Sequence, residues 1–352
     1  MSFSNRFEPV GTRVLSGGLA LLLVWGLGAS ASAPPTADAA GDYEFDDSPR
    51  DEMLVYPDWF NEPFLDLPAD LKVARDAGKG LILYFGQKRC AYCHQLMDVN
   101  FGSDEDTVEY TRRHFNITPI DIWGVAEVTD LRGGVLSERA FALREQAEFT
   151  PTLIFYDDAG NEVLRLRGYY PPYQFRAALE YVADAHYRRE TFRDYLARGE
   201  NRMVFDAADM NDQPFFQPPP FNLDRRLPAE RPLAVFFEQG DCHPCDVLHG
   251  QALRERAISE AFAGFDSVQL DMWSSTPVVT PSGERTTAHQ WAARLGLFYA
   301  PAVVFFDEQG KEILRVDSVV GFYRLRNVLN YMSSKAYLEE PSYQRWRVKR
   351  AF

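Results

Sequence analysis

The chain has 352 residues, of which 46% are hydrophobic, and its formal net charge is −14 at pH 7. The length exceeds that of one average domain and predicts two, and the apolar content is sufficient for two hydrophobic cores. The negative charge argues against nucleic acid and against anionic membrane surfaces as partners. One basic segment, Arg345–Arg350, departs from this balance, and we interpret it as a solvated C-terminal tail.

The N-terminus has the pattern of an export signal. Two arginines precede a mostly apolar run at residues 14–27, and small residues follow it. We assign residues 1–33 to a signal peptide, with cleavage after Ala31 or Ala39, and an uncleaved membrane anchor stays open as the alternative. Both alternatives place the folded protein outside the cytoplasm, in the periplasm or secreted, and residues 34–56 follow as a flexible leader.

Residues 57–200 predict a first α/β domain. Hydrophobic spacing predicts a helix, a strand, a further helix, a strand, a proline-preceded strand and a closing helix. These segments are, in chain order, Leu67–Ala77, Leu81–Phe85, Val108–His114, Ile117–Trp123, Phe149–Phe155 and Phe175–Tyr187. An Asp-x-x-Gly turn at 157–160 predicts a hairpin after the proline-preceded strand. The pair Cys90-x-x-Cys93 follows the first strand closely.

The same pattern recurs in the second half of the chain. The matching segments are Asp121–Trp123 with Asp271–Trp273, and Phe155–Arg165 with Phe305–Arg315. These segments are 150 residues apart, and the second cysteine pair, Cys242-x-x-Cys245, is 152 residues from the first. A slip of two residues over that length indicates a duplicated domain, which we assign to residues 230–352.

A proline-rich segment at 201–229 lies between the two copies. Such connectors are semi-rigid and solvated, so we expect this one to space the domains. Phe215, Phe216 and Phe221 within it allow two interpretations. They are either loop aromatics or the cover of an apolar patch on one domain.

All four cysteines belong to the two Cys-x-x-Cys pairs. Two structural disulfides are possible in an oxidising compartment, but such small loops give little stabilisation, so redox or metal chemistry is favoured. A cysteine at a helix N-terminus has its thiolate stabilised by unpaired N–H groups and by the helix dipole. We therefore assign Cys90 and Cys242 as the attacking cysteines, and Cys93 and Cys245 as the resolving ones.

This order of elements and motifs resembles the thioredoxin fold, and in particular the exported SoxW-type thioredoxin-like proteins associated with sulfur oxidation. The resemblance rests on Tyr84-Phe85, Cys90-x-Tyr92-Cys93-His94, Asp121–Gly124, Thr150-Pro151-Thr152 and Arg167-Gly168-Tyr169. It implies two tandem thioredoxin folds, each with a central mixed β-sheet flanked by helices. It also implies that Pro151 and Pro301 follow cis peptide bonds, and that Thr150 and Ala300 guide a substrate's backbone beside the dithiols.

The sequence departs from ordinary cytosolic thioredoxins beneath the dithiols. Those proteins have an aspartate six residues before the first cysteine, where this chain has Tyr84 and Phe236. Glu238 could replace that aspartate in the second copy, although we expect it to face solvent. A thioredoxin-like general-base step is therefore in doubt at both sites.

Charged neighbours also differ between the two pairs. Lys88 and Arg89 favour the thiolate of Cys90. In the second pair, the carboxylate of Asp241 disfavours the thiolate of Cys242, whereas a protonated His243 favours it. A lower pKa of the attacking cysteine stabilises the reduced dithiol and makes the disulfide a stronger oxidant. Our hypothesis is that the two sites have unequal reduction potentials.

These features predict an exported thiol–disulfide oxidoreductase that needs no cofactor and reduces protein disulfides or persulfides. Its electrons would come from a membrane-bound thiol donor. Two alternatives stay open: a disulfide oxidase or isomerase that uses the same cysteines, and a function in which one copy binds a client or a metal without catalysis. A metal site of Cys90, Cys93 and His94 is disfavoured, because His94 would point elsewhere around the helix.

Overall fold

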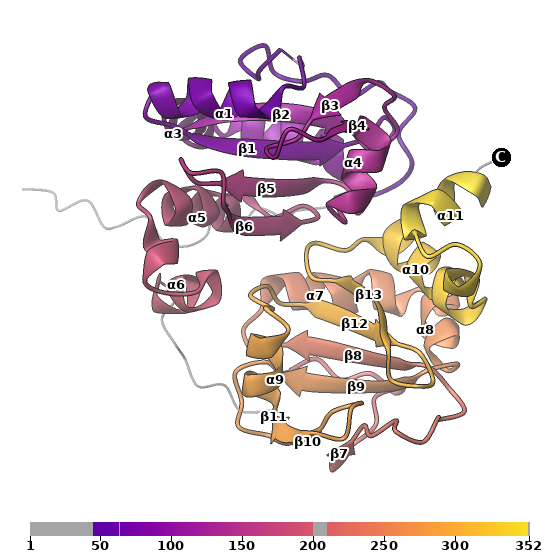
Figure 1. The fold of residues 1–352 in the computed structure, drawn as a ribbon. Helices are drawn as coiled ribbons and strands as arrows, with labels where there is room; N and C mark the ends of the chain where they lie inside the picture. The colour runs from indigo at the N-terminus through magenta and orange to yellow at the C-terminus, as the bar shows by residue number, and fades with distance from the viewer. Residues whose placement is uncertain (1–44, 63, 200–209, 351–352) are drawn as a thin grey trace, which may run out of the picture. The chain divides into compact units, whose positions relative to one another are not determined.

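The computed structural model describes residues 45–62, 64–199 and 210–350. The expected signal peptide, the leader up to residue 44 and residues 201–209 of the expected linker lie outside this description. Phe45–Phe352 form one compact unit. Its described residues contain two four-stranded sheets, one from each copy of the sequence pattern (Figure 1).

The first sheet has the strand order β2-β1-β5-β6. Strand β1 (Gly80–Gly86) runs parallel to β2 (Phe115–Asp121) and antiparallel to β5 (Thr152–Tyr156), which pairs with β6 (Glu162–Arg167). The helices are α1 (Leu67–Asp76), α2 (Ala91–Gln95), α3 (Glu105–His114), α4 (Glu138–Arg144), α5 (Pro172–Ala183) and α6 (Phe192–Gly199), with a π-helical segment at Leu96–Ser103. A small hairpin consists of β3 (Glu127–Thr129) and β4 (Val135–Ser137).

The second sheet repeats this topology as β13-β12-β8-β9. Strand β8 (Leu233–Glu238) is parallel to β9 (Asp266–Asp271) and antiparallel to β12 (Ala302–Phe306), which pairs with β13 (Glu312–Val316). The helices are α7 (His243–Gly250), α8 (Arg256–Phe262), α9 (Ala288–Arg294), α10 (Phe322–Ser333) and α11 (Tyr343–Arg350). A three-stranded sheet joins β7 (Phe221–Asn222), β10 (Pro277–Val279) and β11 (Arg285–Thr287).

Strand β1 is buried on both faces, which explains why its sequence is a continuous apolar run rather than an alternating one. Ile82 and Tyr84 belong to one core with Phe155, whereas Leu83 and Phe85 belong to a second core on the other face. Strand β8 is divided in the same way between two cores of the second domain. Each cysteine pair therefore follows a strand that is fixed by packing on both of its faces.

The described part of the expected leader is packed rather than free. Phe45 and Tyr56 pack against the core of the first domain, and the ring of Tyr56 meets that of Tyr84 edge to face at 5.7 Å. Asp47 is buried and makes hydrogen bonds. These contacts differ from the flexible leader that we expected up to residue 56, because aromatic side chains in this segment bury apolar surface.

The expected linker is also partly built into a domain. The ring of Phe215 stacks on that of Phe262 at 4.8 Å, and Phe216 meets Phe236 edge to face at 5.0 Å. Of the two interpretations offered by the sequence, cover of an apolar patch on the second domain is therefore the observed one.

The basic C-terminal segment is helical rather than an open tail. It belongs to α11, which buries Tyr343 and Gln344 at its start. No helix among the described residues is both long and apolar enough to cross a membrane.

Candidate active site at two helix N-termini

Each cysteine pair lies where a buried strand turns into a helix. Cys90 and Cys242 are the N-cap residues of α2 and α7, and each Sγ accepts a hydrogen bond from the backbone N–H of the second cysteine, at 3.1 and 3.2 Å. An N-cap side chain normally satisfies a free N–H of the first helical turn with an oxygen. Here a sulfur takes that place, so N–H groups that stabilise a thiolate already point at the predicted nucleophile.

The residue before each first cysteine makes this turn possible. Arg89 and Asp241 have φ angles of 59° and 48°, in the left-handed region that non-glycine residues adopt at a cost. Both side chains are exposed, as are Lys88 and His243. Their proposed influence on the thiolates would therefore act from the solvent side of the dithiols.

Both cysteine pairs are closed as disulfides, with Cα–Cα distances of 5.1 and 5.2 Å. The second cysteine of each pair is the more buried: Cys93 is 0% and Cys245 1% exposed, against 4% for Cys90 and 6% for Cys242. This order agrees with the roles assigned from the sequence, since an attacking thiolate must meet a substrate and a resolving one need not.

The distal proline loops lie directly against the first cysteines. The Thr150–Pro151 and Ala300–Pro301 peptide bonds are cis, as the family resemblance implies. Cys90 Sγ is 3.5 Å from Thr150 Oγ1, and Cys242 Sγ is 3.7 Å from the Ala300 carbonyl oxygen. In each domain the structure thus brings together the four residues that we assigned to catalysis and substrate positioning.

A glutamine in each copy was missed by the sequence reasoning. Gln87 donates to Thr150 Oγ1 at 2.7 Å and accepts from the indole N–H of Trp123 at 2.7 Å. In the second domain, Gln239 accepts from the indole N–H of Trp273 at the same distance. Both glutamines precede the first cysteine by three residues, so the repeat contained a signal that a polar residue recurs there.

Tyr92, between the first two cysteines, is fixed by residues distant in the sequence. Its hydroxyl donates to Asp47 Oδ2 and accepts from the Gly321 N–H, both at 2.8 Å. The guanidinium of Arg324 lies 3.3 Å from the centroid of the Tyr92 ring, and it donates to the Thr150 carbonyl oxygen at 2.9 Å. Burial lowers the pKa of Arg324 from its ordinary value, but an arginine remains charged in proteins.

Helix α11 also contacts the first site. Gln344 is buried and lies 3.5 Å from Thr150 Oγ1 through its amide nitrogen, while Phe149 packs against Tyr343 at a centroid distance of 6.2 Å. A cleft of about 820 Å³ opens here, and Phe149, Tyr343, Gln344 and Arg345 are among the residues that line it. No sequence signal marked Arg324 or Gln344, because their contacts depend on tertiary structure alone.

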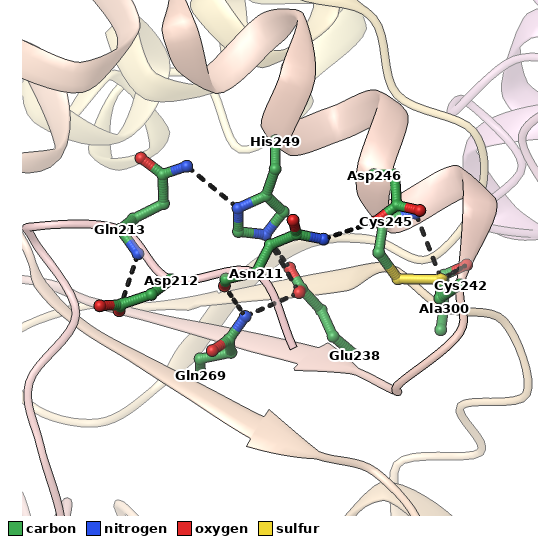
Figure 2. A network of polar contacts seen from close by, with 10 residues as sticks. All are labelled: Asn211, Asp212, Gln213, Glu238, Cys242, Cys245, Asp246, His249, Gln269 and Ala300. Atoms are coloured by element: carbon green, nitrogen blue, oxygen red, sulfur yellow. Dashed lines mark hydrogen bonds and ion pairs between the residues drawn. A yellow bond between two sulfur atoms is a disulfide. The ribbon is translucent and has the colours of Figure 1, made fainter. Parts of the chain in front are cut away.

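The second site has a buried polar network beneath its helix, and here our expectation about Glu238 is wrong. Glu238 does not face solvent: it is 0% exposed, and its carboxylate oxygens lie 2.9 and 3.0 Å from His249 Nε2 (Figure 2). Gln269 donates to Glu238 Oε2 at 2.8 Å, and Gln213 donates to His249 Nδ1 at 3.1 Å. The carboxylate is buried because it has these partners.

His94, the third candidate ligand of a metal site with Cys90 and Cys93, contacts a backbone carbonyl instead. His94 Nε2 lies 3.3 Å from the Glu52 carbonyl oxygen. Within residues 45–62, 64–199 and 210–350, no group of three or more His, Cys, Asp or Glu side chains could hold a metal ion.

Comparison with known families agrees with this geometry. A family model for the thioredoxin-like domain matches the chain twice, at residues 67–183 and 223–333. The chain belongs to the thioredoxin-like family. No curated protein matches it. Each match spans a complete sheet together with its cysteine pair and its distal proline, so this family assignment covers both candidate sites.

Several solved structures are similar to one or both halves of the chain. A thioredoxin-fold protein from Helicobacter pylori is 25% identical, with a TM-score of 0.31, covering 35% of this chain and 80% of its own. A thioredoxin from Thermus thermophilus is 26% identical, with a TM-score of 0.27, covering 35% and 85%. The alkylhydroperoxide reductase protein AhpF from Enterococcus faecalis is 13% identical, with a TM-score of 0.24, covering 77% and 99%.

Two thioredoxin-like domains with a Cys-x-x-Cys pair in each fit a thiol–disulfide oxidoreductase. Thiolate stabilisation at the N-cap, a second cysteine within bonding distance and a loop against the first cysteine are what reversible disulfide exchange requires. Proteins of this kind act on protein thiols in general.

Proposed function

We propose that this protein is an exported thiol–disulfide oxidoreductase that reduces protein disulfides or persulfides through both cysteine pairs. The observation that carries the proposal is the placement of Cys90 and Cys242 as sulfur N-caps beside the two distal proline loops. The export signal in the sequence supports a periplasmic or secreted location, and the SoxW-type resemblance supports a role in sulfur metabolism.

The reaction follows from these positions. In the reduced protein, the thiolate of Cys90 or Cys242 attacks one sulfur of a substrate disulfide, forms a mixed disulfide and releases the other substrate sulfur as a thiolate. Cys93 or Cys245 then loses its proton and attacks the first cysteine. The substrate leaves as a dithiol after proton uptake, and the protein keeps the disulfide, so two electrons pass to the substrate.

Substrate positioning is assigned to the residues before the prolines. A strand-like substrate segment would pair with the backbone of Thr150 or Ala300 and present its sulfur to the neighbouring cysteine. At the first site the Thr150 carbonyl oxygen accepts from Arg324 in this oxidised state, so a substrate backbone would have to replace that bond. Reducing equivalents would return from a membrane-bound thiol donor.

The direction of electron flow is tested by the reduction potential of each site. Two full-length variants, Cys90→Ser with Cys93→Ser and Cys242→Ser with Cys245→Ser, each keep one pair for equilibration in glutathione and dithiothreitol buffers. Potentials well below that of the glutathione couple at both sites are expected for a reductase with a dedicated donor. A potential near the strongly oxidising end at either site would instead assign oxidase or isomerase work there.

A second prediction uses the same two variants. The exposed cations beside Cys90 and the exposed carboxylate beside Cys242 predict unequal potentials, with the first pair the stronger oxidant. Equal potentials at the two sites would contradict the proposed influence of Arg89 and His243.

A further inference from the structure

The two dithiols differ in how far their surroundings are covered. At the first site Ala91, the residue after the attacking cysteine, is buried, and Thr150 of the proline loop is 0% exposed. At the second site the corresponding residues are more open, since His243 is exposed and Ala300 is partly exposed. The same fold therefore holds one covered dithiol and one that is more open.

The cover over the first site depends on Asp47, which is buried. One of its carboxylate oxygens accepts from the backbone N–H of Tyr323 at 3.0 Å, and the other accepts from the N–H of Arg324 and from the Tyr92 hydroxyl, each at 2.8 Å. Helix α10 begins after Gly321, which has no side chain to cap the free N–H groups of the first turn. Asp47 therefore caps α10 from a segment far away in the chain, and its negative charge is favourable at a helix N-terminus.

Tyr92 joins this cap to the first cysteine pair. Its hydroxyl accepts from the Gly321 N–H at 2.8 Å, and Phe45 packs edge to face on its ring at a centroid distance of 4.7 Å. The approach at Gly321 is close, because a Cβ atom there would lie 2.4 Å from the carboxylate carbon of Asp47. We call Asp47, Tyr92 and Gly321 the latch, since their bonds connect the N-terminal segment, the cysteine pair and helix α10.

The latch holds Arg324 over the Thr150 loop. The backbone N–H of Arg324 is bound by Asp47, and its guanidinium donates to the Thr150 carbonyl oxygen. An extended protein segment pairs with another backbone through such carbonyl groups, so this bond has to break before a protein substrate pairs with Thr150. In the described part of the chain, no side chain from the other domain donates to the Ala300 carbonyl oxygen, which lies 3.7 Å from Cys242 Sγ.

A small disulfide does not need to pair with the proline loop. It needs contact with Cys90 Sγ alone, and Cys90 keeps an exposed fraction of 4%. Lys88 and Arg89, which directly precede this cysteine, are exposed. Cys90 is therefore covered by Tyr92 and the Thr150 loop, while its preceding neighbours reach solvent.

We propose that Asp47 and Arg324 determine substrate size at the first dithiol: this dithiol reacts directly with small disulfides, whereas protein disulfides react directly with the second dithiol and reach the first only when the latch opens. The proposal rests on the proposed function and names the substrate class of each site. At either site, the two cysteine thiols lose two electrons and two protons as their disulfide closes, and the substrate disulfide takes them up to become two thiols. Asp47 is a positioning residue, since it acts through α10 and Arg324.

The test uses the full chain in two forms that each keep a single dithiol, one with Cys242→Ser and Cys245→Ser and one with Cys90→Ser and Cys93→Ser. Each reduced form is mixed with an excess of hydroxyethyl disulfide, a small probe, or of insulin, a protein that contains disulfides. Samples are quenched in acid and then alkylated with a maleimide polymer, so that gels report the fraction of closed dithiol. The rate constant with insulin, divided by that with hydroxyethyl disulfide, measures the selectivity for protein substrates and cancels the intrinsic reactivity of each cysteine.

This selectivity ratio is expected to be lower at the first dithiol than at the second by at least about ten-fold, which corresponds to an open population of about 10% or less. Asp47→Ala should raise the first-site ratio by roughly 5–10-fold, since loss of a helix N-cap side chain shifts a local equilibrium by about that factor. Tyr92→Phe removes the hydroxyl of the latch and keeps the ring, so it should raise the ratio in the same direction.

Asp66→Ala is the matched control. The Asp66 carboxylate also caps a helix of the first domain, because it accepts from the Ala69 N–H at the start of α1 at 3.1 Å. Its removal takes away the same charge and the same kind of cap without touching the latch, so the first-site ratio should stay unchanged. Thermal melting checks that each variant remains folded.

Three outcomes would overturn the proposal. They are equal ratios at the two dithiols, a first-site ratio that is unchanged in the folded latch variants, and an equal rise in Asp66→Ala. The first shows that the cover does not select substrates, the second excludes the latch, and the third assigns the effect to general loss of stability. Failure of the proposed function gives a different result, because neither dithiol would then close with either probe.

Discussion

Arg324 provides a quantitative test of how the first dithiol is tuned, because this buried cation and Cys90 both contact Thr150. Replacement by methionine keeps an unbranched side chain over the Tyr92 ring and removes the charge. Thr150 links the two groups, since Arg324 donates to its carbonyl oxygen at 2.9 Å and Cys90 Sγ lies 3.5 Å from its Oγ1. A unit charge about 8 Å from a thiolate contributes about 2 kcal/mol at an effective dielectric constant of about 20. For a two-electron couple, this corresponds to about 40 mV.

The sign of the expected shift in reduction potential is set by the reduced state, because only the reduced dithiol contains a thiolate. The cation stabilises the reduced dithiol when Cys90 is ionised, so Arg324→Met should lower the reduction potential of the first site by about 20–40 mV. The assay is redox equilibration of the full-length Cys242→Ser, Cys245→Ser protein with and without the substitution. Arg326→Met is the matched control, since Arg326 lies on the same helix and is exposed.

Two results would refute this reasoning. A first-site potential that stays within about 10 mV in folded Arg324→Met would show that the cation does not act on the thiolate. An equal shift in Arg326→Met would assign the effect to the overall charge of the protein rather than to the buried group.

Two further predictions concern groups that the fold buries without full compensation. The Tyr84 hydroxyl is buried and has no hydrogen-bond partner among the residues that the structure describes. Tyr84→Phe should therefore leave the free energy of unfolding unchanged or raise it by up to about 1 kcal/mol in urea titrations. A decrease of about 1 kcal/mol would contradict this prediction. Burial raises the pKa of Asp317, so its ionisation opposes folding as the pH rises through that pKa. Asp317→Asn should therefore stabilise the protein by about 1–2 kcal/mol at pH 7, and the gain should vanish at pH values below the unfolded-state pKa, measured by thermal melting across pH.

The fold and the reactive sulfurs were predictable from the sequence because their signals are local or repeated. A cysteine pair after an apolar strand, an aromatic-flanked proline before the next strand and a constant offset between copies are all visible without coordinates. Gln87 and Gln239 carried the same kind of signal, since they recur at the offset of the cysteines. A recurring polar residue does not by itself show its partners, and the bonds to Trp123, Trp273 and Thr150 appear only in the tertiary structure.

Arg324, Gln344 and Asp47 could not be found in this way. They are brought to the first dithiol by contacts between segments that are far apart in the chain, and nothing in their local pattern distinguishes them from surface residues. Glu238 was misjudged for a related reason. A charge at the end of an apolar strand normally marks the point where the strand leaves the core. The burial of Glu238 is understandable only from its hydrogen bonds with His249 and Gln269.

The differences beneath the two dithiols are coupled to one another. A Cβ atom at Gly86 would clash with the ring and hydroxyl of Tyr84, so the first domain cannot hold a glutamate there while it keeps that tyrosine. In the second domain the corresponding residue is Phe236, which lacks the hydroxyl and leaves room for Glu238 on the same face of the strand. Glu238 in turn needs the donors of His249 and Gln269, because an unpaired buried carboxylate would be too costly.

These residues therefore form two alternative sets rather than independent substitutions. Beneath its dithiol the first domain has a mostly apolar set of residues, which are Tyr84, Gly86, Met97 and Pro119. The second domain has a more polar set at the corresponding positions, which are Phe236, Glu238, His249 and Gln269. Both sets are compatible with the same N-cap geometry of the first cysteine. The duplication has thus kept the frame for disulfide exchange and changed the side chains that lie beneath it, from Gly86 and Met97 in the first domain to the hydrogen-bonded Glu238 and His249 in the second.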